Sequence, residues 1–242
     1  MCWSGEASAV LAATGFATTL YAAYKKEPTI LWVCLGYFSL MEALQAYTYS
    51  VINECGNPMN QMATLLGYIH IAFQPFFINA MSMYFIPREI KDRIAIPSYI
   101  ICFIGSILML LHLYPLPTLG HCQIGLPLCG ETLCSVSGNW HIAWELPLNA
   151  WYDWWMIDFT SWIHTLYLPY AVAGFLLPLL YGSWRFTLYH ILLGPLLANT
   201  LTNNPNEWPA VWCLLSIGIL LIVVKTPIRQ WLHVKTWYGK RI

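Results

Sequence analysis

One acidic side chain, Glu42, falls well inside an apolar stretch of the sequence, and His70 falls inside the next such stretch. Ionisable groups inside membrane-sized apolar segments cost free energy, so each is expected to have a partner or a function. Both positions lie equally far from Gly56, in the polar segment 53–58 between the two stretches. If the stretches are antiparallel helices, both side chains lie roughly 13 Å below that segment, at 1.5 Å per residue.

Other polar side chains accompany this pair at helical spacing: Ser39 and Gln45 beside Glu42, and Gln74 beside His70. A carboxylate next to an imidazole could relay protons, hold a metal ion or act as a general acid and base. The alternative is a hydrogen bond in which a protonated Glu42 merely joins two helices. These five residues are the predicted pocket for a ligand, proton or metal ion. Catalytic residues, metal ligands and cofactors stay unassigned.

The segments that carry these residues read as membrane-spanning helices. The 242 residues are 58% apolar and only 9% charged, and about 20 apolar residues cross a bilayer as a helix. Together the apolar runs predict an all-α fold, in which residues 1–242 form a single domain of seven transmembrane helices with one large connection at about 115–161. The runs lie at roughly 7–24, 29–52, 61–86, 94–114, 162–181, 186–203 and 210–225.

Basic residues fix the orientation of these runs. All 11 Lys and Arg residues fall after the first, third, fifth and seventh runs, and basic residues are retained on the cytoplasmic side. The N-terminus is therefore predicted outside and the C-terminus in the cytoplasm. The chain is predicted to be a multi-pass protein of the cell membrane, and the bacterial inner membrane is the expected one. The expected partners are the lipid bilayer and, for the basic tail after Lys225, anionic lipid at the cytoplasmic face. Nucleic-acid binding has no support, because the basic surface faces a membrane.

Cysteines divide by compartment. Cys34 and Cys102 fall within the runs, whereas six others lie outside or at an outer helix end. Cysteines in an oxidising compartment most often form disulfides. Short sequence separations favour bridges within residues 122–134. A bridge between Cys2 and Cys213 is the next expectation. A metal site clustered with His141 is the alternative. The candidates are Cys2, Cys55, Cys122, Cys129, Cys134 and Cys213.

The large connection is rich in turn residues in its first half and in tryptophan in its second. Indole rings prefer the membrane interface, so this half is expected to lie flat on the outer leaflet or to form a lid over a cavity between the helices. Histidines near it, at 112, 121, 141 and 164, are expected to be solvated or interfacial, and His190 to serve packing.

The opening segment Met1-Cys2-Trp3-Ser4-Gly5-Glu6-Ala7-Ser8 resembles an uncharacterised group of bacterial polytopic membrane proteins that begin Met-Cys-Phe/Trp-Ser-x-x-x-Ser. The likeness continues through segments 41–45, 70–75 and 210–213. This family, a domain of unknown function, implies a membrane topology and no activity. It marks family-pattern positions without giving them roles: Cys2, Ser4, Glu42, Gln74 and Cys213.

Three functions fit these observations, and whether the chain is an enzyme stays open. The first is a sensor, transporter or binding protein with an outward-facing polar pocket. The second is a membrane-embedded metal-dependent hydrolase, since seven spans with an outer N-terminus are similar to the alkaline ceramidase and adiponectin-receptor superfamily. The paired histidines of that superfamily's last helix are missing here, because His233 lies beyond the last run. The third is an accessory subunit with a membrane-protein partner, or a homo-oligomer.

Overall fold

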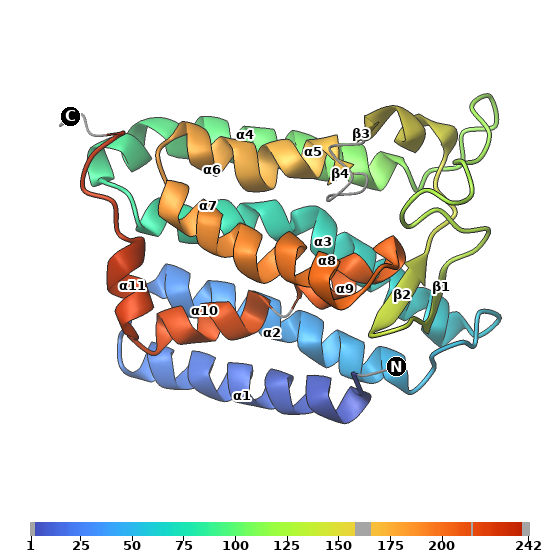
Figure 1. The fold of residues 1–242 in the computed structure, drawn as a ribbon, viewed down its shortest axis with the longest axis horizontal. Coiled ribbons are helices and arrows are strands. Elements are labelled where there is room, and N and C mark those ends of the chain that lie inside the picture. Colours follow the sequence, from blue (N-terminus) through green and yellow to red (C-terminus); the bar gives the residue numbers. More distant parts are fainter. Residues whose placement is uncertain (1–2, 158–165, 214, 239–242) are drawn as a thin grey trace.

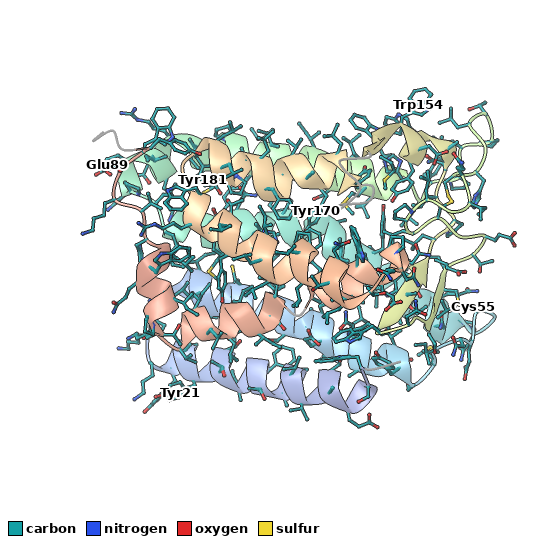
Figure 2. All side chains as sticks on the ribbon, viewed as in Figure 1. Tyr21, Cys55, Glu89, Trp154, Tyr170 and Tyr181 are labelled. Carbon is teal, nitrogen blue, oxygen red and sulfur yellow. A yellow bond between two sulfur atoms is a disulfide. The ribbon has the colours of Figure 1, made fainter. Side chains whose placement is uncertain are left out.

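A bundle of long helices makes up most of the protein, with a folded loop region at one end (Figure 1). The computed structural model describes residues 3–157, 166–213 and 215–238. Within that part, the long helices lie side by side along one direction, and the loop region caps one end of the bundle (Figure 1). Cys55 lies at the loop end and Glu89 at the opposite end (Figure 2), so the polar connections are sorted to the two ends, as the basic-residue pattern predicts.

The first four helices are continuous, and the first and third begin at side-chain caps. The Ser4 side chain accepts a hydrogen bond from the backbone of Ala7, and Asn57 likewise caps a helix whose first residue is Pro58. Both arrangements satisfy N–H groups that a helix leaves unpaired, and proline suits the first helical position. The helices are α1 (Gly5–Tyr24), α2 (Thr29–Tyr49), α3 (Pro58–Tyr84) and α4 (Arg88–Leu111).

The later helices are interrupted rather than regular. Two of them contain a five-residue π-helical segment, a feature often found at functional sites. The first runs through α5 (Leu168–Ala171), η2 (Val172–Leu176) and α6 (Leu177–Leu180). The second runs through α7 (Trp184–Ile191), η3 (Leu192–Leu196) and α8 (Leu197–Leu201). They are followed by η4 (Pro205–Glu207), α9 (Trp208–Trp212), α10 (Leu215–Val223) and α11 (Pro227–Leu232).

Helix makes up most of the described part of every predicted run, and three helical stretches are long and apolar enough to cross a membrane: 29–49, 88–111 and 205–223. The protein is therefore mostly helical with candidate membrane spans. The all-α prediction needs one correction, because short antiparallel strand pairs, which the sequence did not predict, occur in the outer connection and at the start of the fifth run. These are β1 (Cys134–Ser137) with β2 (Ile142–Glu145), and β3 (Met156–Ile157) with β4 (Leu166–Tyr167).

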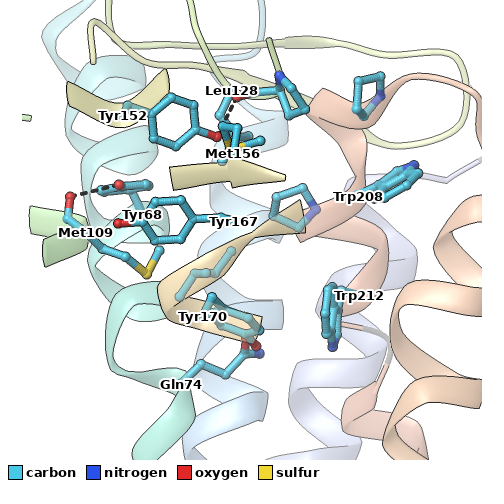
Figure 3. A pocket seen from close by; sticks show the side chains of 14 residues that line it. Tyr68, Gln74, Met109, Leu128, Tyr152, Met156, Tyr167, Tyr170, Trp208 and Trp212 are labelled. Atoms are coloured by element: carbon cyan, nitrogen blue, oxygen red, sulfur yellow. Dashed lines mark hydrogen bonds between the residues drawn. The ribbon is translucent and has the colours of Figure 1, made fainter. Parts of the chain in front are cut away.

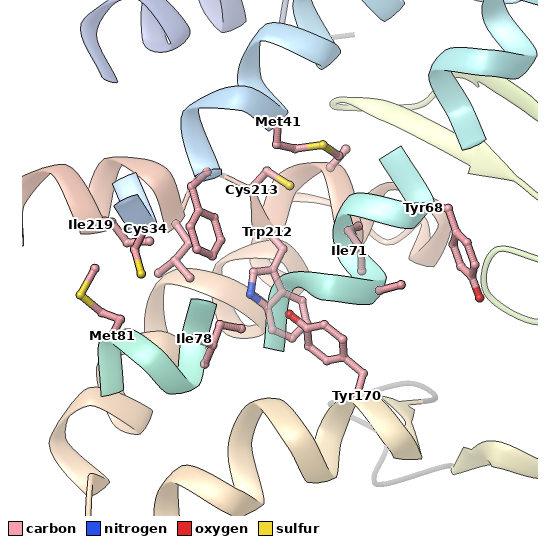
Figure 4. Close-up of a cluster of buried hydrophobic side chains, with 14 of the residues drawn as sticks. Cys34, Met41, Tyr68, Ile71, Ile78, Met81, Tyr170, Trp212, Cys213 and Ile219 are labelled. Atoms are coloured by element: carbon pink, nitrogen blue, oxygen red, sulfur yellow. The ribbon is translucent and has the colours of Figure 1, made fainter. Parts of the chain in front are cut away.

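The core runs along α2 and α3 and continues into α9 and α10. Cys34, Met41, Ile78 and Ile219 are buried there together (Figure 4). By contrast, α4 exposes a row of large apolar side chains at 96, 100, 103 and 104. Exposed apolar surface of this extent indicates contact with a partner or a membrane. The bundle thus has both an apolar interior and an apolar outer face, which fits helices surrounded by lipid.

The end opposite the loops is joined by one ion-pair network. Glu27, in the turn between α1 and α2, lies 2.6 Å from Lys225 Nζ and 3.0 Å from Arg229 Nη1. The hydrogen bond from Lys225 is the main reason that the Glu27 pKa falls below its usual value. Because these residues follow α1 and α10, the network connects the N-terminal and C-terminal parts of the bundle.

Candidate functional site

An aromatic cavity of about 90 Å³ lies beneath the outer loops, between α3, α5 and α9 (Figure 3). Its walls are tyrosine, tryptophan, methionine and proline side chains, and its polar atoms are few. Cavities of this composition suit small, mainly apolar ligands whose orientation is fixed by one or two polar groups. The lining residues are Tyr68, Ile71, Gln74, Met109, Pro127, Leu128, Tyr152, Met156, Tyr167, Tyr170, Pro205, Trp208, Pro209 and Trp212.

Gln74 supplies a polar group at the inner end of this cavity. Its Oε1 accepts a hydrogen bond from the Tyr170 hydroxyl (Figure 3). Its Nε2 is buried and has no hydrogen-bond partner. A buried donor without an acceptor costs about 1–3 kcal/mol. The sequence-based prediction that Gln74 belongs to a pocket therefore has a structural basis, although the other walls are aromatic rather than polar.

Trp212 forms the wall opposite Gln74, and the helix formed by α7, η3 and α8 holds its ring in place. Its Nε1 donates a 3.0 Å hydrogen bond to His190 Nε2, and the His190 ring stacks on Phe175 of the first π-helical segment. A Cβ atom at Gly194 would lie only 2.4 Å from Trp212 Nε1. Gly194 is therefore required for this close approach, and His190 positions an aromatic wall as well as serving packing.

The outer loop closes the cavity. Tyr152, Met156 and Leu128 come from this loop and line the cavity. The Leu128 backbone N–H donates a 2.7 Å hydrogen bond to the Asn206 side chain, which joins the loop to η4. Trp144 is buried, and its ring would contact a Cβ placed at Gly67 of α3. The described loop thus lies over a cavity, as the lid hypothesis predicted.

Glu42, Gln45 and Ser39 lie on another side of the bundle. The Ser216 hydroxyl of α10 donates a 3.2 Å hydrogen bond to Glu42 Oε1. Gln45 Nε2 donates to the Ala210 carbonyl of α9 at 3.2 Å, and Ser39 donates to the Leu35 carbonyl at 2.7 Å. Glu42 and Gln45 are both fully buried. This group therefore faces α9 and α10 rather than α3.

His70 is held elsewhere. Its ring stacks on Tyr37 with 3.9 Å between ring centroids, and the Tyr37 hydroxyl donates to the His70 carbonyl. Among the described residues, no hydrogen bond or ion pair joins His70 to Glu42. Residues 37 and 42 differ by about 140° around a helix, so the face of α2 that meets His70 is not the face that carries Glu42. The described contacts therefore place Glu42 and His70 against different neighbours, and their equal depth stays a prediction.

Glu207 has no role in the sequence-based predictions, yet it is fully buried. Its carboxylate accepts three backbone hydrogen bonds of 2.6–2.8 Å, from Asn139, Trp140 and His141. Gly138 permits this contact, since a Cβ there would lie 2.4 Å from the carboxylate carbon. Glu207 thus anchors the turn between β1 and β2 to the start of α9.

His141 and His112 are buried, which corrects the expectation of solvated rings. His141 Nδ1 accepts from the Ile142 N–H at 2.7 Å and lies 3.2 Å from the Tyr49 hydroxyl. Burial lowers its pKa to about 3. His112 Nε2 lies 2.7 Å from the Tyr167 hydroxyl, and burial lowers the His112 pKa to about 4. His121 is exposed, and position 164 lies outside the described residues.

Two disulfides join the outer cysteines. The Cys122–Cys129 bridge lies within the predicted 122–134 region, whereas Cys55–Cys134 connects the α2–α3 turn to β1. Cys213 is buried, with its Sγ 3.1 Å from the Pro209 carbonyl, and Cys2 lies outside the described residues.

Among those residues, a potential metal-ligand cluster consists of His121 with the cysteines of the shorter bridge. The Cys122–Cys129 disulfide engages both sulfur atoms of this cluster.

Comparisons with known proteins establish the family of the chain. Neither the curated proteins nor the solved structures contain a significant match. One family model matches residues 6–233, and its description is a family of unknown function, DUF5765. That match covers nearly the whole length, so the chain belongs to the DUF5765 family of unknown function.

Proposed function

We propose that this protein is a seven-pass membrane protein that binds a flat, mostly apolar small molecule in the aromatic cavity beneath its outer loop. The ligand accepts a hydrogen bond from Gln74 Nε2, as the carbonyl of a quinone would. The observation that carries this proposal is the buried, unpartnered Gln74 donor in a cavity otherwise lined by aromatic and aliphatic side chains. The protein then acts as a binding protein, sensor or transporter.

The proposed topology places the N-terminus and the cavity outside and the C-terminus in the cytoplasm. The polarity of the basic residues supports it, as does the clustering of the disulfides at the loop end. At the other end, Arg185 lies over the rings of Trp184 and Trp231, in a groove that also contains Lys235. Aromatic and basic side chains together favour contact with anionic lipid headgroups.

Ligand binding is testable with the purified protein. Extraction of protein prepared in mild detergent, followed by mass spectrometry, would reveal a retained ligand. Quenching of tryptophan fluorescence during titration with a short-chain quinone would measure affinity, because Trp208 and Trp212 line the cavity.

Gln74→Leu removes the donor and is expected to weaken quinone binding by about tenfold, which corresponds to 1.4 kcal/mol. Gln61→Leu is the matched control, since Gln61 lies on the same helix and bonds the Cys55 carbonyl outside the cavity. Equal affinities for both variants would contradict the proposed role of Gln74. Absence of saturable quenching in the unmodified protein would contradict quinone as the ligand class.

A further inference from the structure

The Glu42 site contains two buried acceptor atoms that lack donors. Glu42 Oε2 and Gln45 Oε1 are both inaccessible to solvent and have no hydrogen-bond partner. The Gln45 amide cannot be reversed to correct this, because its Nε2 already donates to the Ala210 carbonyl. Both oxygens are therefore buried without compensation. A proton on Glu42 removes the negative charge of the carboxylate and turns an oxygen that needs a donor into a donor.

The side chains around Glu42 provide no alternative positive charge. Hydroxyl groups face it from α1 and α10, at Ser8 and Ser216. The titratable side chains that face it among the described residues are Tyr49 of its own helix and Cys213, which follows α9. No Lys, Arg or His in the described part of the chain forms an ion pair with Glu42. An ionised carboxylate buried without such a partner is strongly disfavoured, so the site favours a proton.

Three cavities follow the seam between α1, α2 and α10, and Glu42 lies near them without lining any of them. An outer groove contains Trp3 and Ala46, and a middle cavity of about 40 Å³ contains Ser39 and Ser216. An inner groove contains Thr18, Glu27 and Lys225. Residue 42 falls between the levels of the outer groove and the middle cavity on α2.

Serine hydroxyls flank Glu42 from α1 and α10, and Ser216 itself borders one of these cavities. Toward the outside, Ser8 accepts a 2.9 Å hydrogen bond from Trp3 Nε1, and Trp3 borders the outer groove. Toward the inside, the Ser216 hydroxyl that bonds Glu42 also borders the middle cavity, as Thr14 does. Such hydroxyls can both donate and accept a proton.

We propose that Glu42 is an exchangeable proton-binding site on a proton path along the seam between α1, α2 and α10. In each transfer the Glu42 Oε2–H bond breaks, the proton passes to a hydroxyl or to water in the grooves, and a proton from the opposite side re-forms the bond. No electron transfer or co-reactant is required. This site is separate from the aromatic cavity, so the inference goes beyond the proposed ligand binding.

Proton flux into liposomes tests this path. The full chain is reconstituted with a pH-sensitive dye inside, and a potassium diffusion potential is imposed with valinomycin. Flux above that of protein-free liposomes is expected, with at least a tenfold loss in Glu42→Gln, whose amide keeps the size of the carboxyl but does not exchange a proton. Glu54→Gln, which alters an exposed outer acid, is the matched control and should retain full flux.

Ser216→Ala provides a second variant that leaves the carboxyl in place. It is expected to lower flux several-fold, and the infrared band of a protonated carboxylic acid should persist in it but disappear in Glu42→Gln. Flux equal to that of empty liposomes, or equal flux in the unmodified protein and Glu42→Gln, would overturn the path. Unchanged quinone affinity in Glu42→Gln would show that the proton site and the aromatic cavity are independent, so that loss of one activity leaves the other intact.

Discussion

The short helix α9 separates two regions whose unsatisfied polar atoms are opposite in kind. On one face, Trp208, Pro209 and Trp212 border an aromatic cavity in which Gln74 presents a donor without an acceptor. On the other, the Ala210 carbonyl faces Gln45, beside acceptors that lack donors. A spare donor suits a carbonyl-bearing ligand, and spare acceptors suit a proton. The same physical rule, that buried polar groups are paired, therefore predicts different occupants on the two sides.

Glu207 immediately precedes α9, the helix that borders both regions, and changing it should have the largest effect. Glu207→Gln replaces a carboxylate that accepts three backbone hydrogen bonds with an amide that presents N–H groups to some of those donors. Hydrogen bonds to charged groups contribute about 1.5–3 kcal/mol each, so we expect a loss of at least about 3 kcal/mol in unfolding free energy. Thermal unfolding in detergent measures this.

Both quinone binding and proton flux should decline in Glu207→Gln, because Glu207 joins the β1–β2 hairpin to the start of α9, and α9 borders both regions. Glu131→Gln, at an exposed loop position, is the control. A stable variant that lost only one of the two activities would show that the hairpin supports a single face.

Gly194→Ala should affect only the aromatic face. Alanine normally stabilises a helix relative to glycine by about 1 kcal/mol, but here its Cβ would lie 2.4 Å from Trp212 Nε1. Overpacking of this kind costs about 1–3 kcal/mol, and the displaced indole should weaken quinone binding by about tenfold or more, measured by fluorescence quenching. Gly36→Ala is the matched control, because its Cβ would make only an ordinary 3.4 Å contact with Thr19.

Reduced proton flux in Gly194→Ala would contradict the separation of the two faces, since Gly194 contacts Trp212 and not the Glu42 seam.

Gln45→Leu should affect only the acceptor face, and more weakly. It removes the orphan Oε1 together with the donor to the Ala210 carbonyl. Leucine replaces polar atoms one helical turn from Glu42 with an apolar side chain, so flux in liposomes should decline several-fold. Quinone affinity should stay within about twofold of the unmodified protein. A larger change in affinity would mean that α9 transmits changes from one face to the other.

The sequence predicted the helical segments well, because apolar runs are strong one-dimensional signals, and the orientation inferred from the basic residues stays a prediction. The sequence did not predict direction: Glu42 and His70 are equally far from Gly56 in the sequence, yet the contacts of Ser216 and Tyr37 show that they face different neighbours. Rotation about a helix axis is decided by packing against distant segments. For the same reason the Cys55–Cys134 bridge, with a sequence separation of 79, was not favoured over bridges between nearby cysteines.

Acidification should have the smallest of these effects near neutral pH. Its effect on folding stability should grow as the pH falls. Burial holds the His141 pKa at about 3 in the folded protein, against about 6.5 for an exposed histidine. Between these values the unfolded chain binds a proton that the folded chain does not, so stability is complete above about pH 6.5 and falls as the pH is lowered toward 3. His141→Asn keeps an acceptor for the Ile142 N–H but cannot titrate, and should flatten this part of the melting-temperature profile. His112 titrates in the same direction, with a pKa of about 4, so some decline should remain.

Because His141 lies next to the turn that Glu207 anchors, both faces of α9 should lose function together in acid. An unchanged profile in His141→Asn would assign the acid sensitivity to other groups and leave the hairpin outside the pH response.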